Sequence, residues 1–253
     1  MISIIMITYN RGLYIRKAIE SVLKQSYKDW ELIIIDDCST DDTAEIIKSI
    51  NDERIKYFRN EINLGISKSR NRALSLCKGE FVAVLDSDDF WIQNEKLVKQ
   101  FDFLKSNKNC AVVGTSAVVF DENEQKIREL IVPLGDEKIR KSILIKNPFV
   151  HSSVLMVRHV VLECGGYFET MEVGEDYKLW LEIGKKYKMA NLRDLTTGYR
   201  VHKKNTVSTK IMLALKNNIE LVKGYQNDYP NYLFAISRRC FRYFIYRLYR
   251  IFI

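Results

Sequence analysis

The sequence predicts an α/β fold in which helices flank a mixed, mostly parallel sheet, followed by a helical tail at the C-terminus. Two observations predict the sheet. Over the first 105 residues, runs of apolar and β-branched residues alternate with stretches of helical periodicity, as they do in βαβ units. Three of these apolar runs end abruptly in polar residues, which is typical of parallel strands whose carboxyl ends form a ligand site.

The predicted elements of the first half are short and evenly spaced. The apolar runs predict strands over Ile2–Ile7, Glu31–Ile35, Ile55–Phe58 and Phe81–Leu85. The periodic stretches between them predict helices over Gly12–Gln25, Thr43–Ser49, Ser67–Cys77 and Asn94–Lys105. The second half is more mixed, with strands near Ala111–Phe120, Ser153–Val157 and Thr197–Val201 and a helix over Glu175–Tyr187.

Composition fits an ordered, cytoplasmic protein. The chain has 253 residues, 47% of them hydrophobic and only three of them proline, so it can bury a sizeable core. Its five cysteines are scattered, odd in number and without CxxC spacing, which favours reduced thiols over disulfides or a zinc site. The apolar start lacks a basic region and is short for a signal peptide, and we see no stretch of about 18 apolar residues that could span a membrane.

Three polar clusters follow predicted strands. They are Thr8-Tyr9-Asn10-Arg11, Asp36-Asp37-Cys38-Ser39 and Asp86-Ser87-Asp88-Asp89. Because the carboxyl ends of parallel strands meet at one edge of a sheet, we expect the three clusters to lie together. Crowded carboxylates repel one another unless a cation neutralises them, and a hard divalent metal with phosphate oxygens is a natural partner. The alternative is that these acids cap the helices that follow.

Further short motifs follow in order along the chain. They are Asn63-Leu64-Gly65, Ser69-Arg70-Asn71, Asn147-Pro148-Phe149-Val150-His151, Gly165-Gly166-Tyr167, Glu175-Asp176 and Tyr199-Arg200-Val201-His202. With the three clusters, their order and spacing resemble glycosyltransferase family 2, which has the GT-A fold, from the first strand to about residue 208. The resemblance implies a nucleotide-binding half over residues 1–105 and an acceptor half over 106–208, with a helical extension over 209–253.

The resemblance implies roles for residues on the donor side. Asp36 accepts a hydrogen bond from the nucleobase, and Asp86 lies near the ribose or the metal. Asp88 ligates Mg²⁺ or Mn²⁺, with His202 as a candidate further ligand, and a surface or capping histidine as the alternative. The remaining candidate nucleotide-binding residues are Thr8, Tyr9, Arg11, Ser39 and Arg70, although Arg70 could equally be an exposed arginine on a helix.

On the acceptor side, the resemblance implies that Asp176 is the general base that deprotonates the acceptor hydroxyl. Attack on the anomeric carbon then displaces the nucleotide and inverts the configuration. Glu175 and His151 are expected to support the site or shape the acceptor side. The alternative for Glu175 and Asp176 is that both acids only complement the dipole of their helix.

The tail carries much of the net charge of +8, since the last 18 residues contain five arginines and no acidic side chain. Its aromatic and aliphatic residues recur on one helical face, which predicts a basic amphipathic helix from about residue 236. That face comprises Phe241, Phe244, Ile245, Leu248 and Phe252. We expect it to bind an anionic membrane surface; packing on the protein itself and a homodimer interface are the alternatives. Nothing resembling an RNA- or DNA-binding motif accompanies the charge, so we expect no nucleic acid partner.

Together these observations predict an inverting, metal-dependent glycosyltransferase. It moves a sugar from a nucleotide donor, UDP-linked by family habit, to a hydroxyl of a lipid-linked saccharide in bacterial surface polysaccharide synthesis. Two alternatives stay open at this stage. One is a sugar-1-phosphate nucleotidyltransferase, and the other is a catalytically silent subunit that binds nucleotide sugars or acts as a scaffold.

Overall fold

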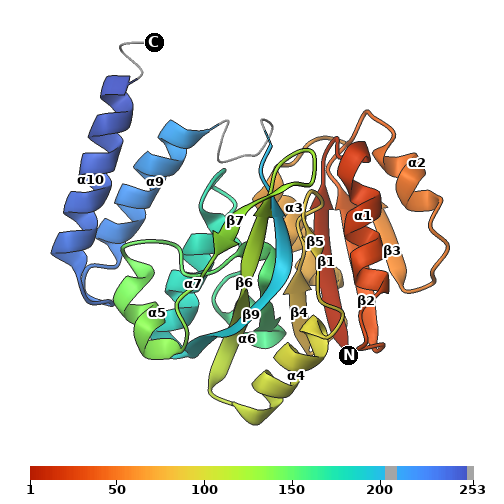
Figure 1. The fold of residues 1–253 in the computed structure, drawn as a ribbon, viewed down its shortest axis with the longest axis horizontal. Coiled ribbons are helices and arrows are strands. Elements are labelled where there is room, and N and C mark those ends of the chain that lie inside the picture. The colour runs from red at the N-terminus through yellow and green to blue at the C-terminus, as the bar shows by residue number, and fades with distance from the viewer. Residues whose placement is uncertain (203–209, 250–253) are drawn as a thin grey trace.

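The computed structural model of the protein describes residues 1–202 and 210–249 (Figure 1). A nine-stranded sheet forms its centre, with strand order β3-β2-β1-β4-β8-β6-β9-β5 and with β7 paired to β6. The nucleotide-side half is parallel and contains β1 (Ile2–Thr8), β2 (Trp30–Asp36), β3 (Ile55–Arg59) and β4 (Phe81–Val84). Thr8 pairs with Asp36, so the polar clusters after β1 and β2 start at the same level of the sheet.

The other half of the sheet is mixed. Strand β8 (Leu155–Val157) runs antiparallel to both β4 and β6 (Cys110–Phe120), and the long β9 (Lys188–Arg200) runs parallel to β6. Two short strands complete it, namely β5 (Phe90–Trp91), antiparallel to the end of β9, and β7 (Lys126–Leu130). Through β5, the segment that follows the Asp86–Asp89 cluster is fixed beside the end of β9.

Helices cover both faces of the sheet and explain why β1 and β2 are apolar throughout. Ile2, Ile4 and Met6 pack with α1 (Gly12–Leu23), whereas Ile5 packs on the opposite face in the cluster that includes α3 (Ile66–Leu76) and α7 (Glu175–Lys186). Strands buried on both faces read as continuous apolar runs, which is why the sequence reveals them. The remaining helices of the body are α2 (Thr43–Lys48), α4 (Lys96–Ser106), α5 (Asp136–Ile143), the 3₁₀ turn η1 (His151–Ser153) and α6 (Arg158–Glu163).

The tail forms a hairpin of two helices, α9 (Ile211–Gly224) and α10 (Tyr232–Tyr249), beside α5 and α7 (Figure 1). The Tyr229 hydroxyl donates to the Leu181 carbonyl of α7 at 2.7 Å. Arg239 of α10 donates to the Leu144 carbonyl and to the Tyr177 hydroxyl, both at 2.8 Å. One side of the tail therefore packs on the protein itself, as one of the alternatives predicted.

The predicted alternation of strands and helices in the first 105 residues is confirmed, with ends that differ by one or two residues. Within the first 105 residues the prediction missed only the two-residue strand β5. In the second half it missed β7, α5 and α6, it began the last strand at Thr197 instead of Lys188, and it began the tail helix four residues late. Strand β7 is almost wholly exposed and β5 has two residues, so neither leaves an apolar run to detect.

Two composition-based expectations can be compared with the structure. All five cysteines are free thiols. Within residues 1–202 and 210–249, no helix is both long enough and apolar enough to cross a membrane.

Lys96 is an unusual core residue because its side chain is fully buried at the start of α4. Its ammonium nitrogen lies 2.7 Å from the Gln100 carboxamide oxygen and 4.2 Å from the centre of the Trp91 ring. No carboxylate among the described residues pairs with it, and desolvation is the sole influence on its pKa. Burial therefore lowers the pKa of Lys96 well below its usual value.

Replacing Lys96 by methionine should stabilise the protein at pH 7, by on the order of 1 kcal/mol or more, because methionine needs no desolvation of an amine. Because burial lowers the pKa of Lys96 in the folded protein, the unfolded chain binds the proton of this amine more tightly, so this residue makes stability rise with pH up to about 10. The advantage of Lys96→Met should thus shrink between pH 7 and pH 10. Urea unfolding across this range, with the exposed Lys108→Met as control, measures it; a destabilised variant with an unchanged pH slope contradicts it.

Candidate active site

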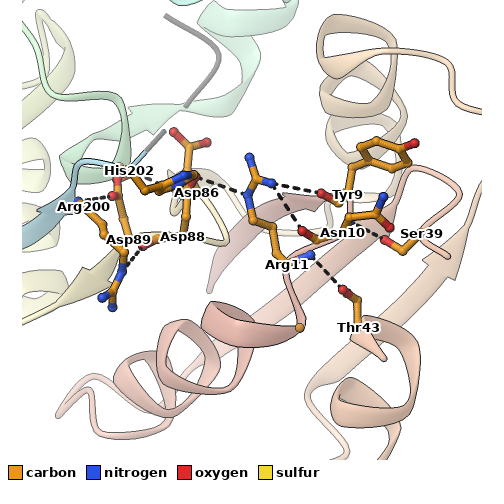
Figure 2. Close-up of polar contacts among 12 residues, drawn as sticks. Tyr9, Asn10, Arg11, Ser39, Thr43, Asp86, Asp88, Asp89, Arg200 and His202 are labelled. Carbon is orange, nitrogen blue, oxygen red and sulfur yellow. Dashed lines mark hydrogen bonds and ion pairs between the residues drawn. The ribbon is translucent and has the colours of Figure 1, made fainter. Parts of the chain in front are cut away.

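The loops after β1 and β2 are joined to each other at the edge of the sheet (Figure 2). The Asn10 N–H donates to the Ser39 hydroxyl at 3.0 Å, and the Thr40 N–H donates to the Asn10 side-chain oxygen at 2.8 Å. The Arg11 N–H donates to the Thr43 hydroxyl at 2.9 Å. Thr8 is buried at the end of β1, and its hydroxyl has no hydrogen-bond partner among the described residues. A buried hydroxyl of this kind is suited to a ligand.

Asp36 and Asp37 hold loops from inside the protein. Asp36 is fully buried and accepts hydrogen bonds at 2.8 Å from the Ser39 N–H and the Tyr57 hydroxyl. Asp37 accepts from the backbone N–H groups of Leu64 and Gly65 at 2.8 and 2.9 Å, and so fixes the turn before α3. In this conformation Asp36 does not face solvent, and its contact with a nucleobase stays a prediction. Sequence reasoning missed the holding role of Asp37.

Asp88 lies between side chains of two distant elements (Figure 2). Its Oδ2 atom is 2.9 Å from Nε2 of His202 and 3.3 Å from Nε of Arg11. His202 is almost fully buried and stacks on Tyr14 with ring centres 5.1 Å apart, so the alternative of a surface histidine is wrong. Figure 2 shows Tyr9, which is 44% exposed, pointing away from these acids.

Asp89 fastens the end of β9 to this loop, a role that sequence reasoning missed. Its carboxylate accepts from the Arg200 N–H at 2.8 Å and from the Ser152 hydroxyl at 2.5 Å. The Arg200 Nε atom donates to the Asp88 carbonyl at 3.0 Å. Burial and then repulsion from Asp88 and Asp86 raise the pKa of Asp89. Asp88 and His202 are thereby held side by side, although they lie 114 residues apart.

The donor atoms around Asp88 fit a partial metal site. Among the described residues, no three histidine, cysteine or acidic side chains converge as a complete cage. Asp88 supplies a carboxylate oxygen and His202 an imidazole nitrogen that already face each other. Mg²⁺ and Mn²⁺ both accept a carboxylate and take further oxygens from phosphate and water, and the imidazole nitrogen suits Mn²⁺ better than Mg²⁺. Asp88 and His202 therefore suit a cation that arrives with a diphosphate.

Arg70 is buried between two carboxylates, so the alternative of an exposed arginine is wrong. Its guanidinium donates to Asp86 at 2.8 Å and to Glu175 at the start of α7. Burial by itself raises the pKa of Asp86, but Arg70 and then His151 outweigh it and hold that pKa below its usual range. Burial dominates at Glu175 and raises its pKa.

His151 supports the same cluster. Its Nε2 atom lies 2.9 Å from the Tyr167 hydroxyl, and its Nδ1 atom lies 3.6 Å from Asp86. Neither Nδ1 of His151 nor Nε of Arg70 has a hydrogen-bond partner among the described residues, although both are buried. The structure thus brings together Arg70, Asp86, Glu175 and His151, which the sequence placed on separate motifs.

Asp176 lies at the start of α7 and remains partly exposed, as a base that must meet an acceptor requires. Gly174, with φ of +90°, turns the chain into the helix just before it. The Oδ2 atom of Asp176 accepts a hydrogen bond from the Asn147 amide at 2.8 Å. The buried Arg70 therefore lies at the centre of the site with its partners Asp86 and Glu175. Asp88 follows the first partner along the chain, and Asp176 follows the second.

Comparisons with known proteins show the family and the fold of the chain. The model of the family Glycosyl transferase family 2 matches residues 3–166. A relative from Escherichia coli, the UDP-Glc:alpha-D-GlcNAc-diphosphoundecaprenol beta-1,3-glucosyltransferase WfgD, is 33% identical over 212 residues, which are 83% of this chain and 81% of that protein.

Two solved structures share the fold. S. aureus TarS (residues 1–349) in complex with UDP-GlcNAc superposes with a TM-score of 0.73 at 20% identity, over 95% of this chain and 72% of that one. The mannosyltransferase PcManGT from Pyrobaculum calidifontis, in complex with GDP-Man and Mn²⁺, gives 0.69 at 16% identity over 94% and 72%. The fold and the site together define a glycosyltransferase with the GT-A fold, as predicted. The chain belongs to glycosyltransferase family 2, and neither a nucleotidyltransferase nor a silent subunit has support.

Arg70→Met should lower the free energy of unfolding by about 3 kcal/mol or more, because the buried Glu175 and the partly buried Asp86 lose their cation. Adding Glu175→Gln should restore part of the loss, because the more deeply buried of the two acids is then neutral. Urea unfolding at pH 7 measures both effects, with the exposed Arg16→Met on α1 as control. A loss below about 1 kcal/mol, or no recovery in the double variant, contradicts the central role of Arg70.

Proposed function

We propose that the enzyme is an inverting glycosyltransferase that uses a divalent cation and a UDP-linked sugar. The observation that carries the proposal is the convergence of Asp88, His202 and Arg11 at the edge of the sheet, with the partly exposed Asp176 on the neighbouring helix. A carboxylate, an imidazole and a guanidinium suit a cation and a diphosphate. A carboxylate at the acceptor side suits proton removal.

In this mechanism Asp88 and His202 would hold the cation, and Arg11 would donate hydrogen bonds to phosphate oxygens. A bound cation would supply Lewis-acid stabilisation of the nucleoside diphosphate leaving group. Asp176 takes the proton of the acceptor hydroxyl, whose oxygen attacks the anomeric carbon from the face opposite the diphosphate. The bond from the anomeric carbon to the diphosphate oxygen breaks, and both of its electrons stay on that oxygen. The configuration of the anomeric carbon is thereby inverted. Thr8, Ser39 and Asp36 line or hold the pocket for the nucleoside.

The substrates follow from the relatives. The name of WfgD specifies UDP-glucose as donor and a GlcNAc-diphospholipid as acceptor, and TarS has been crystallised with UDP-GlcNAc. We infer that this enzyme also takes a UDP-sugar and extends a lipid-linked saccharide in bacterial surface polysaccharide synthesis. We infer that the enzyme meets this acceptor at the inner face of the cell membrane.

UDP should raise the melting temperature of the enzyme by several degrees in the presence of Mn²⁺, and less in its absence. A ligand at 100 times its Kd stabilises the native state by about 2.7 kcal/mol. GDP and dTDP should give smaller shifts, because we expect the pocket to select the base. Thermal shift measurements with and without Mn²⁺ test both points.

In Asp88→Ala the metal-dependent part of this shift should disappear, whereas Asp102→Ala, which removes an exposed acid from α4, should keep it. If no nucleotide gives a metal-dependent shift, or if Asp88→Ala retains it, the donor site is not at Asp88.

We further propose that α10 brings the enzyme to the membrane. The side of α10 opposite to Arg239 leaves large apolar side chains in solvent, namely Leu233, Phe234, Phe241, Phe244, Ile245 and Leu248. Phe252 and Arg250, which we expected on this helix, lie outside the described residues. The exposed arginines Arg238, Arg242 and Arg247 flank the apolar side, and α10 has no acidic residue.

The charge of α10 favours an anionic bilayer over a second copy of the chain. Two copies of α10 in contact would bring arginines against arginines, whereas each arginine near an anionic surface contributes on the order of 1 kcal/mol. Arg239, one of the five arginines of the tail, does not take part, because it binds the Leu144 carbonyl and the Tyr177 hydroxyl. Removing the whole tail would break these contacts, so point substitutions test the proposal better.

Wild-type enzyme should sediment with vesicles that contain phosphatidylglycerol and much less with pure phosphatidylcholine. The pair Phe241→Ser and Phe244→Ser should abolish sedimentation, and Arg238→Gln with Arg242→Gln and Arg247→Gln should remove the preference for anionic lipid. Ile127→Ser, which removes an apolar side chain that is 55% exposed on β7, is the matched control. Absence of vesicle binding, together with a dimer that Phe244→Ser dissociates, favours the homodimer instead.

A further inference from the structure

The side-chain amide of Asn147 makes two hydrogen bonds, one to Asp176 and one within its own loop. Its Nδ2 atom donates to Asp176 at 2.8 Å, and its Oδ1 atom accepts the Phe149 N–H at 3.1 Å. Since a backbone N–H can only donate, the carbonyl oxygen of the amide must face Phe149. The NH₂ group is therefore the one that faces Asp176, and the orientation of the amide is fixed by its own loop.

The loop of Asn147 is anchored to the helix that carries Asp176. The ring of Phe149 packs on Trp180, one turn further along α7, with ring centres 5.2 Å apart. On the other side, the Asn191 amide donates to the Pro148 carbonyl at 3.1 Å. These contacts hold the Asn147 amide at a fixed position relative to Asp176.

The contact leaves Asp176 free to act on an acceptor. Among the described residues, Asn147 is the one hydrogen-bond partner of the Asp176 side chain, and it contacts Oδ2. The Oδ1 atom stays available for a proton. An amide donor orients a carboxylate without placing a full positive charge beside it, whereas a lysine or arginine would oppose its protonation.

We propose that Asn147 is a positioning residue that holds the Asp176 carboxylate with Oδ1 toward the acceptor hydroxyl. The inference rests on the proposed role of Asp176 as general base. Asn147 itself takes up and releases no proton, and it contributes through the orientation of Asp176.

Charged or titratable groups on α7 itself, on α3, on the loop before α7 and on β9 also interact with Asp176. Glu175 and Tyr177 flank Asp176 on α7, and Arg70 lies beneath Glu175. Tyr167 and Tyr199, from the preceding loop and from β9, also interact electrostatically with Asp176. These groups stay in place in any variant of residue 147, so a change among such variants reports on the amide.

The test compares Asn147→Ala and Asn147→Asp with wild type. The assay follows UDP release from UDP-glucose with α-GlcNAc-diphosphoundecaprenol as acceptor probe, between pH 5 and pH 9. We expect kcat to fall about 10-fold in Asn147→Ala, with the donor KM unchanged, because donor contacts are not affected. We also expect the acidic limb of the kcat profile to move to higher pH, further in Asn147→Asp, where a second carboxylate faces Asp176.

Two further variants distinguish an error in the role of Asn147 from an error in the proposed base Asp176. Val22→Ala removes buried apolar atoms on α1 and leaves the Asn147 loop intact, so its melting temperature should fall while the acidic limb stays in place. Asp176→Asn should abolish turnover and keep the thermal shift with UDP. If Asp176→Asn still turns over, the base is another residue and the proposed mechanism fails. If Asp176→Asn is inactive but both Asn147 variants keep the wild-type pH profile and kcat, only the positioning role is wrong.

Discussion

The site depends first on Arg70, a buried cation that joins the donor half of the molecule to the acceptor half. It binds Asp86 after β4 and Glu175 at the start of α7, two segments that no local pattern links. A buried ion pair stabilises only when its geometry and hydrogen bonds offset desolvation, and removal of one member leaves an uncompensated charge. Asp88 follows one partner of Arg70 by two residues, and Asp176 follows the other by one. The distance between the proposed metal ligand and the proposed base is thus set by Arg70.

Burial divides the acids of this sheet edge into two groups. Asp37 and Asp89 are buried and accept backbone N–H groups, so they hold the turn before α3 and the end of β9. Asp88 and Asp176 are more accessible and contact side chains that a ligand can displace or join. Carboxylates serve both purposes because one carboxylate accepts several hydrogen bonds. Asp37 and Asp89 thus fix loops, whereas Asp88 and Asp176 are left for the substrates.

Much of the fold was predictable from the sequence, and the reason is physical. Strands β1, β2 and β4 are buried on both faces, so their apolar runs stand out, and Asp36 and Asp88 could be assigned to one edge from strand order alone. Partners distant in the chain could not be predicted. The contact of Arg70 with Glu175 spans 105 residues, and that of Asp88 with His202 spans 114. The sequence suggested an exposed Arg70 nearly as readily as one that contacts the nucleotide, and nothing in its own helix indicates a buried pair with Asp86 and Glu175.

The helix α7 links the chemistry to the tail. Asp176 and Tyr177 are adjacent at its first turn, and the Tyr177 hydroxyl accepts a hydrogen bond from Arg239 of α10. Arg239 therefore does not belong to the exposed basic surface of the tail. Its hydrogen bonds hold α10 against α7, the helix that carries the proposed base. A rigid connection of this kind means that a bilayer bound to the outer side of α10 has a defined position relative to Asp176. A lipid-linked acceptor anchored in that bilayer could then reach Asp176 without any movement of α10, because docking and catalysis share one helix.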